Sequence, residues 1–177
     1  MIVKSAVLAG LMFTGLSFTP VSAPPAAFVA EPAPDAAFLR ATHQADLAEI
    51  AGGNIAATRG TTPEVRALGT RFVHDHTVIE THLTAVARSA GVALPDTPTA
   101  AQLALTKKYQ AVPAAAFDRL YLRTQLKAHN EALAAGAAEL AGGQDPRVKQ
   151  LVSFAAPLVK AHHAALTAAL GYGGHAR

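Results

Sequence analysis

The chain has 177 residues, of which 51% are hydrophobic and only 15% are charged, and its formal net charge is +3. A chain of this length accommodates one domain with one hydrophobic core. The absence of Cys excludes disulfides, thiol catalysis, cysteine zinc sites and iron–sulfur clusters. Because the net charge is small and the Lys and Arg residues are scattered, the sequence predicts no nucleic-acid partner.

Residues 1–23 have the features of a secretory signal peptide. Lys4 precedes an apolar run over residues 6–13, and residues 21–23 (Val-Ser-Ala) have the small side chains that signal peptidases prefer. A retained membrane anchor is the alternative, but the apolar run is shorter than the roughly 20 residues that span a bilayer. We therefore expect an exported, periplasmic protein with a flexible linker over residues 24–35, no transmembrane helix after cleavage, and an association with the envelope.

The first two long helices are expected to form an antiparallel hairpin. Small and apolar residues recur at alternating spacings of three and four from the predicted N-cap Asp35 to near Gly60, which is typical of a helix in a bundle. This helix should weaken at the glycine pair 52–53, because glycine is unfavourable inside helices. Thr62 and the proline after it predict the start of the second helix, which should end at Gly91.

The second half of the chain is expected to repeat this hairpin after a crossover. Three prolines between Gly91 and Ala114 leave room only for a short helix. The sequence predicts an all-α four-helix bundle of ferritin-like topology, in which two antiparallel hairpins are joined by that crossover. The expected segments are a short helix over 100–109, long helices over 113–142 and 145–171, a bundle domain over 36–171 and a tail over 172–177.

Three of the eight histidines fall on the apolar faces of the long helices. His76, His129 and His162 each lie three or four residues from an apolar residue on either side, so all three are expected to point into the core. On the first helix, Glu49 adjoins the apolar face, with Asp46 three residues before it. The remaining histidines are expected at the surface or rim: His43, His74, His82, His163 and His175.

One interpretation of the inward histidines is structural. Imidazoles can hydrogen-bond buried backbone or carboxylate groups and thereby fix the register of a bundle. In that case Asp118 and Tyr121 on the third long helix are expected to hydrogen-bond the imidazoles. Acid–base catalysis is a less favoured alternative, because the sequence has no hydrolase, phosphate-binding or dinucleotide-binding motif.

The other interpretation is a metal site formed by Glu49, His76, His129 and His162. Imidazole suits zinc, copper and iron alike, so the residues do not identify the ion. Counting from the hairpin turn separates His129 and His162 by about five residues, or roughly 7 Å of helical rise, which opposes a shared site. The sequence therefore favours the structural interpretation and leaves metal binding as the alternative.

Several segments resemble, in order and spacing, a bacterial family of exported proteins of unknown function with a ferritin-like fold, often labelled membrane or outer-membrane proteins. The resemblance implies a helical bundle outside the cytoplasm and no settled activity. None of the three inward histidines follows a Glu by three residues, which disfavours a di-iron carboxylate centre. We therefore predict a non-enzymatic envelope or stress-related module. The matching segments are 46–50, 72–77, 116–122, 127–129 and 156–162.

Overall fold

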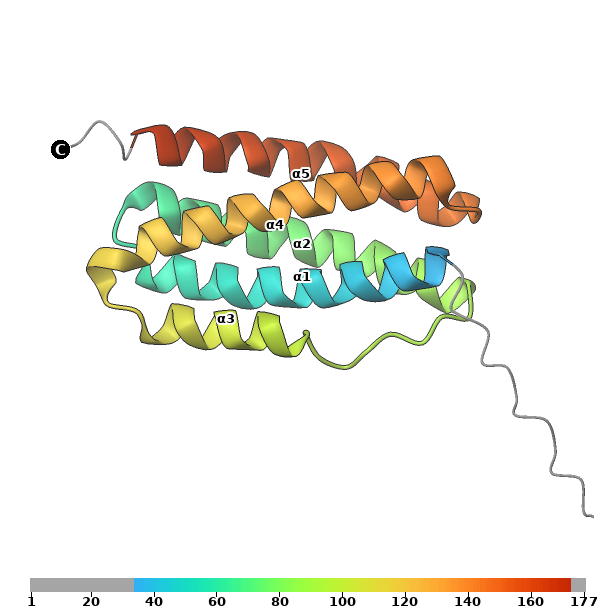
Figure 1. The fold of residues 1–177 in the computed structure, drawn as a ribbon, viewed down its shortest axis with the longest axis horizontal. Coiled ribbons are helices and arrows are strands. Elements are labelled where there is room, and N and C mark those ends of the chain that lie inside the picture. The colour runs from blue at the N-terminus through green and yellow to red at the C-terminus, as the bar shows by residue number, and fades with distance from the viewer. Residues whose placement is uncertain (1–33, 173–177) are drawn as a thin grey trace, which may run out of the picture. The chain divides into compact units, whose positions relative to one another are not determined.

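The computed structural model describes residues 34–172, with side chains up to residue 171. Within this range all regular secondary structure is helical, and short turns and the crossover loop join the helices α1 (Pro34–Arg59), α2 (Pro63–Ser89), α3 (Ala100–Ala111), α4 (Ala114–Gly142) and α5 (Pro146–Tyr172) (Figure 1). No helix in the described range is long and apolar enough to cross a bilayer. The predicted signal peptide, most of the predicted linker, His175 and most of the predicted tail lie outside the described residues.

The four long helices pack as two hairpins side by side. Residues 60–62 join α1 to α2, and residues 143–145 join α4 to α5. Between the hairpins, α2 packs against α5 and α1 packs against α4, while α3 lies along the outside of α1 and also contacts α4 (Figure 1). The prediction of an all-helical bundle is therefore confirmed, with a fifth, short helix in the crossover.

Local capping explains where several helices begin. The Thr62 side chain accepts a hydrogen bond from the Val65 amide (3.3 Å), so Thr62 is the N-cap of α2 as predicted. Thr99 and Gln102 form a reciprocal capping box at the start of α3. Asp145 accepts from the Arg147 amide at 2.8 Å at the start of α5. These contacts satisfy amides that have no partner within their own helix.

The first turn of α1 differs from the prediction. The helix begins at Pro34, so Asp35 lies inside the first turn and is not its N-cap. Its carboxylate instead accepts from the backbone amides of Gln144 and Asp145, both at 2.9 Å. The predicted cap was wrong because Asp35 joins the start of α1 to the α4–α5 turn, a contact between segments far apart in sequence.

The glycines of α1 do not weaken the helix, contrary to the prediction. A Cβ atom on Gly53 would lie 2.8 Å from the carbonyl oxygen of Gly69, and one on Gly69 would lie 2.6 Å from that of Gly53. A Cβ on Gly52 would lie 3.2 Å from the ring of Tyr109 on α3. Glycine here permits close approach of α1 to α2 and α3, and the resulting contacts offset its low helix propensity.

Two groups of buried apolar side chains fill opposite ends of the bundle. The aromatic cluster lies toward the α1–α2 turn and consists of Ala56, Val65, Leu68, Phe72, Tyr109, Phe117, Tyr121, Leu122 and Leu166. The aliphatic cluster lies toward the α4–α5 turn and consists of Leu39, Leu83, Ala87, Val148 and Leu151. The inward histidines lie between the two clusters, where Phe72 of the aromatic cluster contacts their rings.

Candidate metal centre

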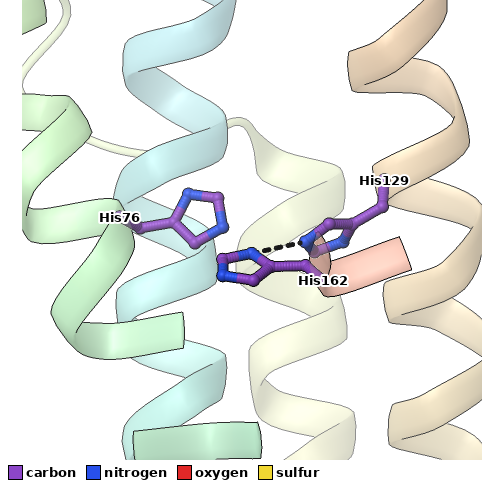
Figure 2. A group of neighbouring side chains, drawn as sticks. All are labelled: His76, His129 and His162. Atoms are coloured by element: carbon purple, nitrogen blue, oxygen red, sulfur yellow. Dashed lines mark hydrogen bonds between the residues drawn. The ribbon is translucent and has the colours of Figure 1, made fainter. Parts of the chain in front are cut away.

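Three imidazoles from three helices meet in the core. One ring nitrogen from each of His76 (α2), His129 (α4) and His162 (α5) lies within 4.8 Å of the other two. Figure 2 shows the rings turned toward one another, and all three side chains are buried. The closest pair is His129 Nε2 and His162 Nδ1, at 3.2 Å. The inward placement predicted from the apolar spacing is confirmed for all three histidines.

The depth offset between His129 and His162 does not keep them apart, contrary to the prediction from residue counting. In an α-helix the Cα–Cβ bond tilts toward the N-terminus of that helix. Because α4 and α5 are antiparallel, His129 leans away from the turn that joins them and His162 leans toward it. The two side chains thus lean toward each other and close a gap that the count of Cα positions overestimates.

The outer nitrogen of each imidazole contacts a hydrogen-bond acceptor. His76 Nδ1 lies 2.8 Å from Asp46 Oδ1, and His162 Nε2 lies 2.8 Å from Asp75 Oδ2. His129 Nδ1 lies 2.9 Å from the backbone carbonyl oxygen of Gln125, one turn earlier on α4. A carboxylate or a carbonyl oxygen can only accept, so each outer nitrogen carries the proton and donates.

This donation fixes the state of the inner nitrogens. In a neutral imidazole only one nitrogen carries a hydrogen, so His129 Nε2 and His162 Nδ1 are both left with a lone pair. These two lone pairs face each other at 3.2 Å with no hydrogen between them. Among the described residues, His76 Nε2 also has no hydrogen-bond partner. When His76 is neutral, the centre of the cluster thus has three acceptors and no donor.

The pKa values keep two of the three imidazoles neutral. Burial lowers the pKa of His129 to about 3, and burial likewise lowers the pKa of His162 to about 4. Burial by itself would raise the pKa of Asp75, but hydrogen bonds from His74 and His162 outweigh it and hold the value at about 2. At neutral pH, therefore, His162 donates to an ionised carboxylate while its inner nitrogen stays unprotonated.

His76 has the opposite tendency. Burial lowers its pKa, but the hydrogen bond to Asp46 and the nearby charge of Glu49 outweigh that effect, and the net shift is upward. A proton on His76 Nε2 would be the only positive charge that the three imidazoles carry near neutral pH. A cation bound at the centre would displace that proton, so its binding would release a proton to solvent.

Phe72 closes the cluster on the side of the aromatic cluster. Its ring centroid lies 4.4 Å from that of His162 and 5.0 Å from that of His129, and it meets His76 edge-on at 6.2 Å. This apolar wall limits access of water to the inner nitrogens and supports the burial that lowers two of the imidazole pKa values.

Glu49 does not join the three nitrogens. Its carboxyl group is buried, and the Gln125 amide, oriented by its partners, donates to both Glu49 oxygens, one of them at 2.8 Å. Burial raises the pKa of Glu49 to about 7. Glu49 instead lines a cavity of about 640 Å³, together with Asp46, His76 and His129. Of the four predicted metal ligands, the structure brings together the three histidines and leaves the carboxylate beside them.

Sequence reasoning missed one buried histidine. It also did not pair His76 with Asp46 or His162 with Asp75. His43 was expected at the surface, but it is buried, with Nδ1 2.7 Å from Glu80 Oε1 and Nε2 2.8 Å from the Pro95 carbonyl oxygen. The spacing of three from His43 through Asp46 to Glu49 is a polar stripe on one face of α1 and was the available signal. His74 and His82 are exposed as predicted, and His163 is half-buried.

The predicted hydrogen bonds from Asp118 and Tyr121 to the imidazoles are absent from the described range. Asp118 instead accepts from the amides of Thr61 (2.8 Å) and Thr62 (2.9 Å), at the start of α2. The Tyr121 hydroxyl is buried in the aromatic cluster and has no partner among the described residues. Both residues are too near the N-terminus of α4 to reach the cluster, because Gln125 and His129 lie one and two turns further along.

A family model described as "Domain of unknown function (DUF4142)" matches residues 21–169 of the chain. Among solved structures, the chain is similar to the "Crystal structure of DUF305 fragment from Deinococcus radiodurans", with 17% identity, a TM-score of 0.66, and coverage of 80% of this chain and 99% of that one. No curated protein matches the chain. At 17% identity the structural likeness concerns the fold alone.

Proposed function

The chain belongs to the DUF4142 family, whose description names no activity, and from the chain's own residues we propose that it binds one divalent transition-metal ion. The ligands are the inner nitrogens of His76, His129 and His162. A single observation carries the proposal: His129 Nε2 and His162 Nδ1 face each other at 3.2 Å, while the other nitrogen of each ring contacts an acceptor. Two lone pairs at this distance repel unless a cation lies between them, and imidazole nitrogens are common metal ligands.

The spacing of the nitrogens suits a metal ion. Zinc–imidazole bonds of about 2.0–2.1 Å in a tetrahedral site hold two ligand nitrogens about 3.4 Å apart. The observed 3.2 Å between His129 and His162 is close to this value. His76 is within 4.8 Å of both, so a small rotation of its side chain completes a three-histidine face. The same residue types suit copper and iron, and we do not distinguish among the three ions.

The outer contacts of the imidazoles also support the proposal. Histidines that bind metals almost always donate their second N–H to a carboxylate or a backbone carbonyl, which orients the ring and makes the ligand nitrogen more basic. Asp46, Asp75 and the carbonyl of Gln125 accept these bonds from the three imidazoles. The ionised carboxylate of Asp75 also supplies negative charge that neutral imidazoles lack.

We extend the proposal to the setting in which the ion is held. The signal-like residues 1–23 support export to the periplasm, where an envelope or stress-related role without catalysis fits the absence of a catalytic motif from the sequence. The two packed helical hairpins support a ferritin-like topology, but not a di-iron centre, because the ligand set is histidine rather than glutamate.

The test is a metal titration of tag-free protein stripped of ions by a chelator. With each of zinc, copper and ferrous iron, we expect at least one ion to bind with one equivalent per chain. A free concentration 100-fold above Kd should stabilise the folded state by about 2.7 kcal/mol, seen as a higher Tm. The variant His129→Gln should lose both the bound ion and the Tm increase, and the exposed His82→Gln should retain them.

Two results would refute metal binding at the three histidines. One is an unchanged Tm and no retained ion in the wild-type protein for all three metals. The other is equal retention of the ion by the wild-type protein and by His129→Gln. In either case the histidines would have the structural role that the sequence favoured, and their acceptor-rich centre would have to share a proton instead.

A further inference from the structure

A cavity opens beside the histidines, in the part of the bundle near the α4–α5 turn. Its volume is about 640 Å³, within the range of roughly 300–1,000 Å³ usual for small-molecule sites. In Figure 1 the ribbons of α1 and α4 diverge toward the Pro34 end of α1, and side chains of both helices line the cavity. The larger apolar wall residues include Phe38, Ile79, Leu133 and Leu140.

Small side chains leave this space open. Ala41 and Ala45 of α1, and Ala128, Ala132 and Gly136 of α4, occupy wall positions where a bundle would otherwise carry larger apolar residues. Leu140 on the wall is 41% exposed. An apolar molecule in the cavity would remove such surface from water, which stabilises binding by about 25 cal/mol per Å² of apolar area.

Buried polar groups gather at one side of the cavity, and two of them have an atom without a hydrogen-bond partner. Asp46 is 3% exposed and His76 is 6% exposed, and both line the cavity. Among the described residues, Asp46 Oδ2 and His76 Nε2 make no hydrogen bond. Glu49, also buried, lines the same side. Buried polar atoms without a partner are rare in folded proteins, so Asp46 Oδ2 calls for a donor from a bound molecule, whereas His76 Nε2 belongs to the proposed metal site.

We propose that this cavity binds an elongated apolar molecule with one hydrogen-bond-donating head group, a hydroxyl or an amino group. The head group donates to Asp46 Oδ2 and Glu49, and the apolar tail lies along the alanine-rich wall between α1 and α4. The inference goes beyond metal binding and does not require it, because the head group needs none of the three inner imidazole nitrogens.

The charges at the polar end select the head group. A carboxylate head has no hydrogen to donate to Asp46 Oδ2 or to Glu49, and it would be repelled by either carboxyl group in its ionised form. A hydroxyl group satisfies an acceptor without adding charge, and an ammonium group also attracts both carboxyl groups. The cavity should therefore discriminate by head group among molecules with the same tail.

The experiment uses the full folded chain in its metal-free state, with chelator present, and three probes that share one tail: decylamine, 1-decanol and decanoate. Isothermal titration should show one decylamine or decanol molecule per chain, with decanoate at least tenfold weaker. The variant Ala45→Leu, which extends a side chain into the cavity, should weaken binding of the amine and the alcohol at least tenfold. Ala138→Leu, on the exposed face of α4 outside the cavity, should bind like wild type.

A second variant tests the head-group contact. Glu49→Leu should reduce the preference for decylamine over decanoate, while circular dichroism checks that the helices persist. The inference is overturned if no probe binds saturably, if decanoate binds tightest, or if Ala45→Leu and Ala138→Leu bind equally well. Failure of the metal site would instead leave these affinities intact and abolish the metal-dependent Tm increase, so the two failures are distinguishable.

Discussion

The two ends of the bundle are filled in different ways. Toward the α1–α2 turn, Phe117 stacks on Tyr121 with nearly parallel rings (9°), and Tyr109 meets both rings edge-on. All three side chains are almost completely buried. Toward the α4–α5 turn, the aliphatic cluster is smaller and a cavity of about 640 Å³ lies beside it.

This difference separates the parts of the molecule that hold it together from the part that can accept a ligand. The aromatic cluster ties α3 to α4 and anchors Phe72, which contacts the imidazoles. The alanine-lined part leaves polar groups of α1 open to the cavity. The histidines at the boundary therefore have a rigid wall on one side and space on the other, which is the arrangement of a site with one accessible face.

The largest expected effect is on the free energy of unfolding, which we compare for one substitution at each end of the bundle. Phe117→Ala should lower the free energy of unfolding by about 3–5 kcal/mol, because it leaves a void among fully packed rings. Leu133→Ala on the cavity wall should cost less than about 2 kcal/mol, because that side chain is only half-buried and already borders open space. Urea denaturation measures both values, and a larger loss for Leu133→Ala would reverse the assignment of the rigid end.

The fold was largely predictable from local signals. Thr62 with the following proline marked the start of α2, and the prolines of the crossover limited α3 to a short helix that begins at Ala100 as predicted. These signals act within one turn of helix, so the sequence carries them without tertiary information. The role of Asp35 depends on the distant residues 144–145, and no local pattern could reveal it.

The next effect concerns acid stability. The folded pKa of His162 is about 4, below the ordinary histidine value of about 6.5, so its contribution to stability is complete above about pH 6.5 and is lost as the pH falls toward 4. His162→Gln removes this titration. The free energy of unfolding of the variant should therefore decrease less steeply with falling pH than that of wild type, by up to about 1.4 kcal/mol per pH unit. Melting curves from pH 7 to pH 4 measure it.

The control for acid stability is His82→Gln, since His82 is exposed and should leave the pH profile unchanged. Glu49 titrates in the opposite sense: its raised pKa of about 7 makes stability fall as the pH rises from about 4.5 through 7. For this reason the informative quantity is the difference between variant and wild type at each pH. Parallel profiles for His162→Gln and wild type would contradict a depressed pKa for His162.

The site was predictable in part, and the limit was geometric. Spacing alone placed His76, His129 and His162 on apolar faces, because the helical period fixes direction around the axis. Depth along the axis was misjudged because counting Cα positions ignores the tilt of side chains in antiparallel helices. The cavity was not predicted, because alanine on the apolar face of a helix predicts that neighbouring helices pack closely. Only the structure shows that α1 and α4 diverge.

A smaller effect is expected from the group that orients an imidazole. Asp75→Asn keeps the size of the side chain but removes the charge that accepts from His162 Nε2 at 2.8 Å. Loss of such a contact typically weakens metal affinity about 10–100-fold. Competition with a chromophoric chelator should show this loss, whereas Asp96→Asn, at an exposed position in the crossover, should not. Equal affinities in the two variants would remove Asp75 from the proposed site.

The smallest effect concerns the end of the bundle where the cavity lies. Glu139 of α4 is buried beside Asp35 of α1, and burial together with that neighbour raises its pKa to about 7. A raised carboxyl pKa means that the folded state loses stability as the pH rises from about 4.5 through 7, because ionised Glu139 is repelled by Asp35. Glu139→Gln cannot ionise and should be more stable than wild type by about 1 kcal/mol at pH 8, with little difference at pH 5.

The exposed Glu131→Gln should show no such pH dependence. If Glu139→Gln shifted Tm equally at both pH values, the contact between Glu139 and Asp35 would not depend on the proton, and repulsion between α1 and α4 would not control this end of the bundle.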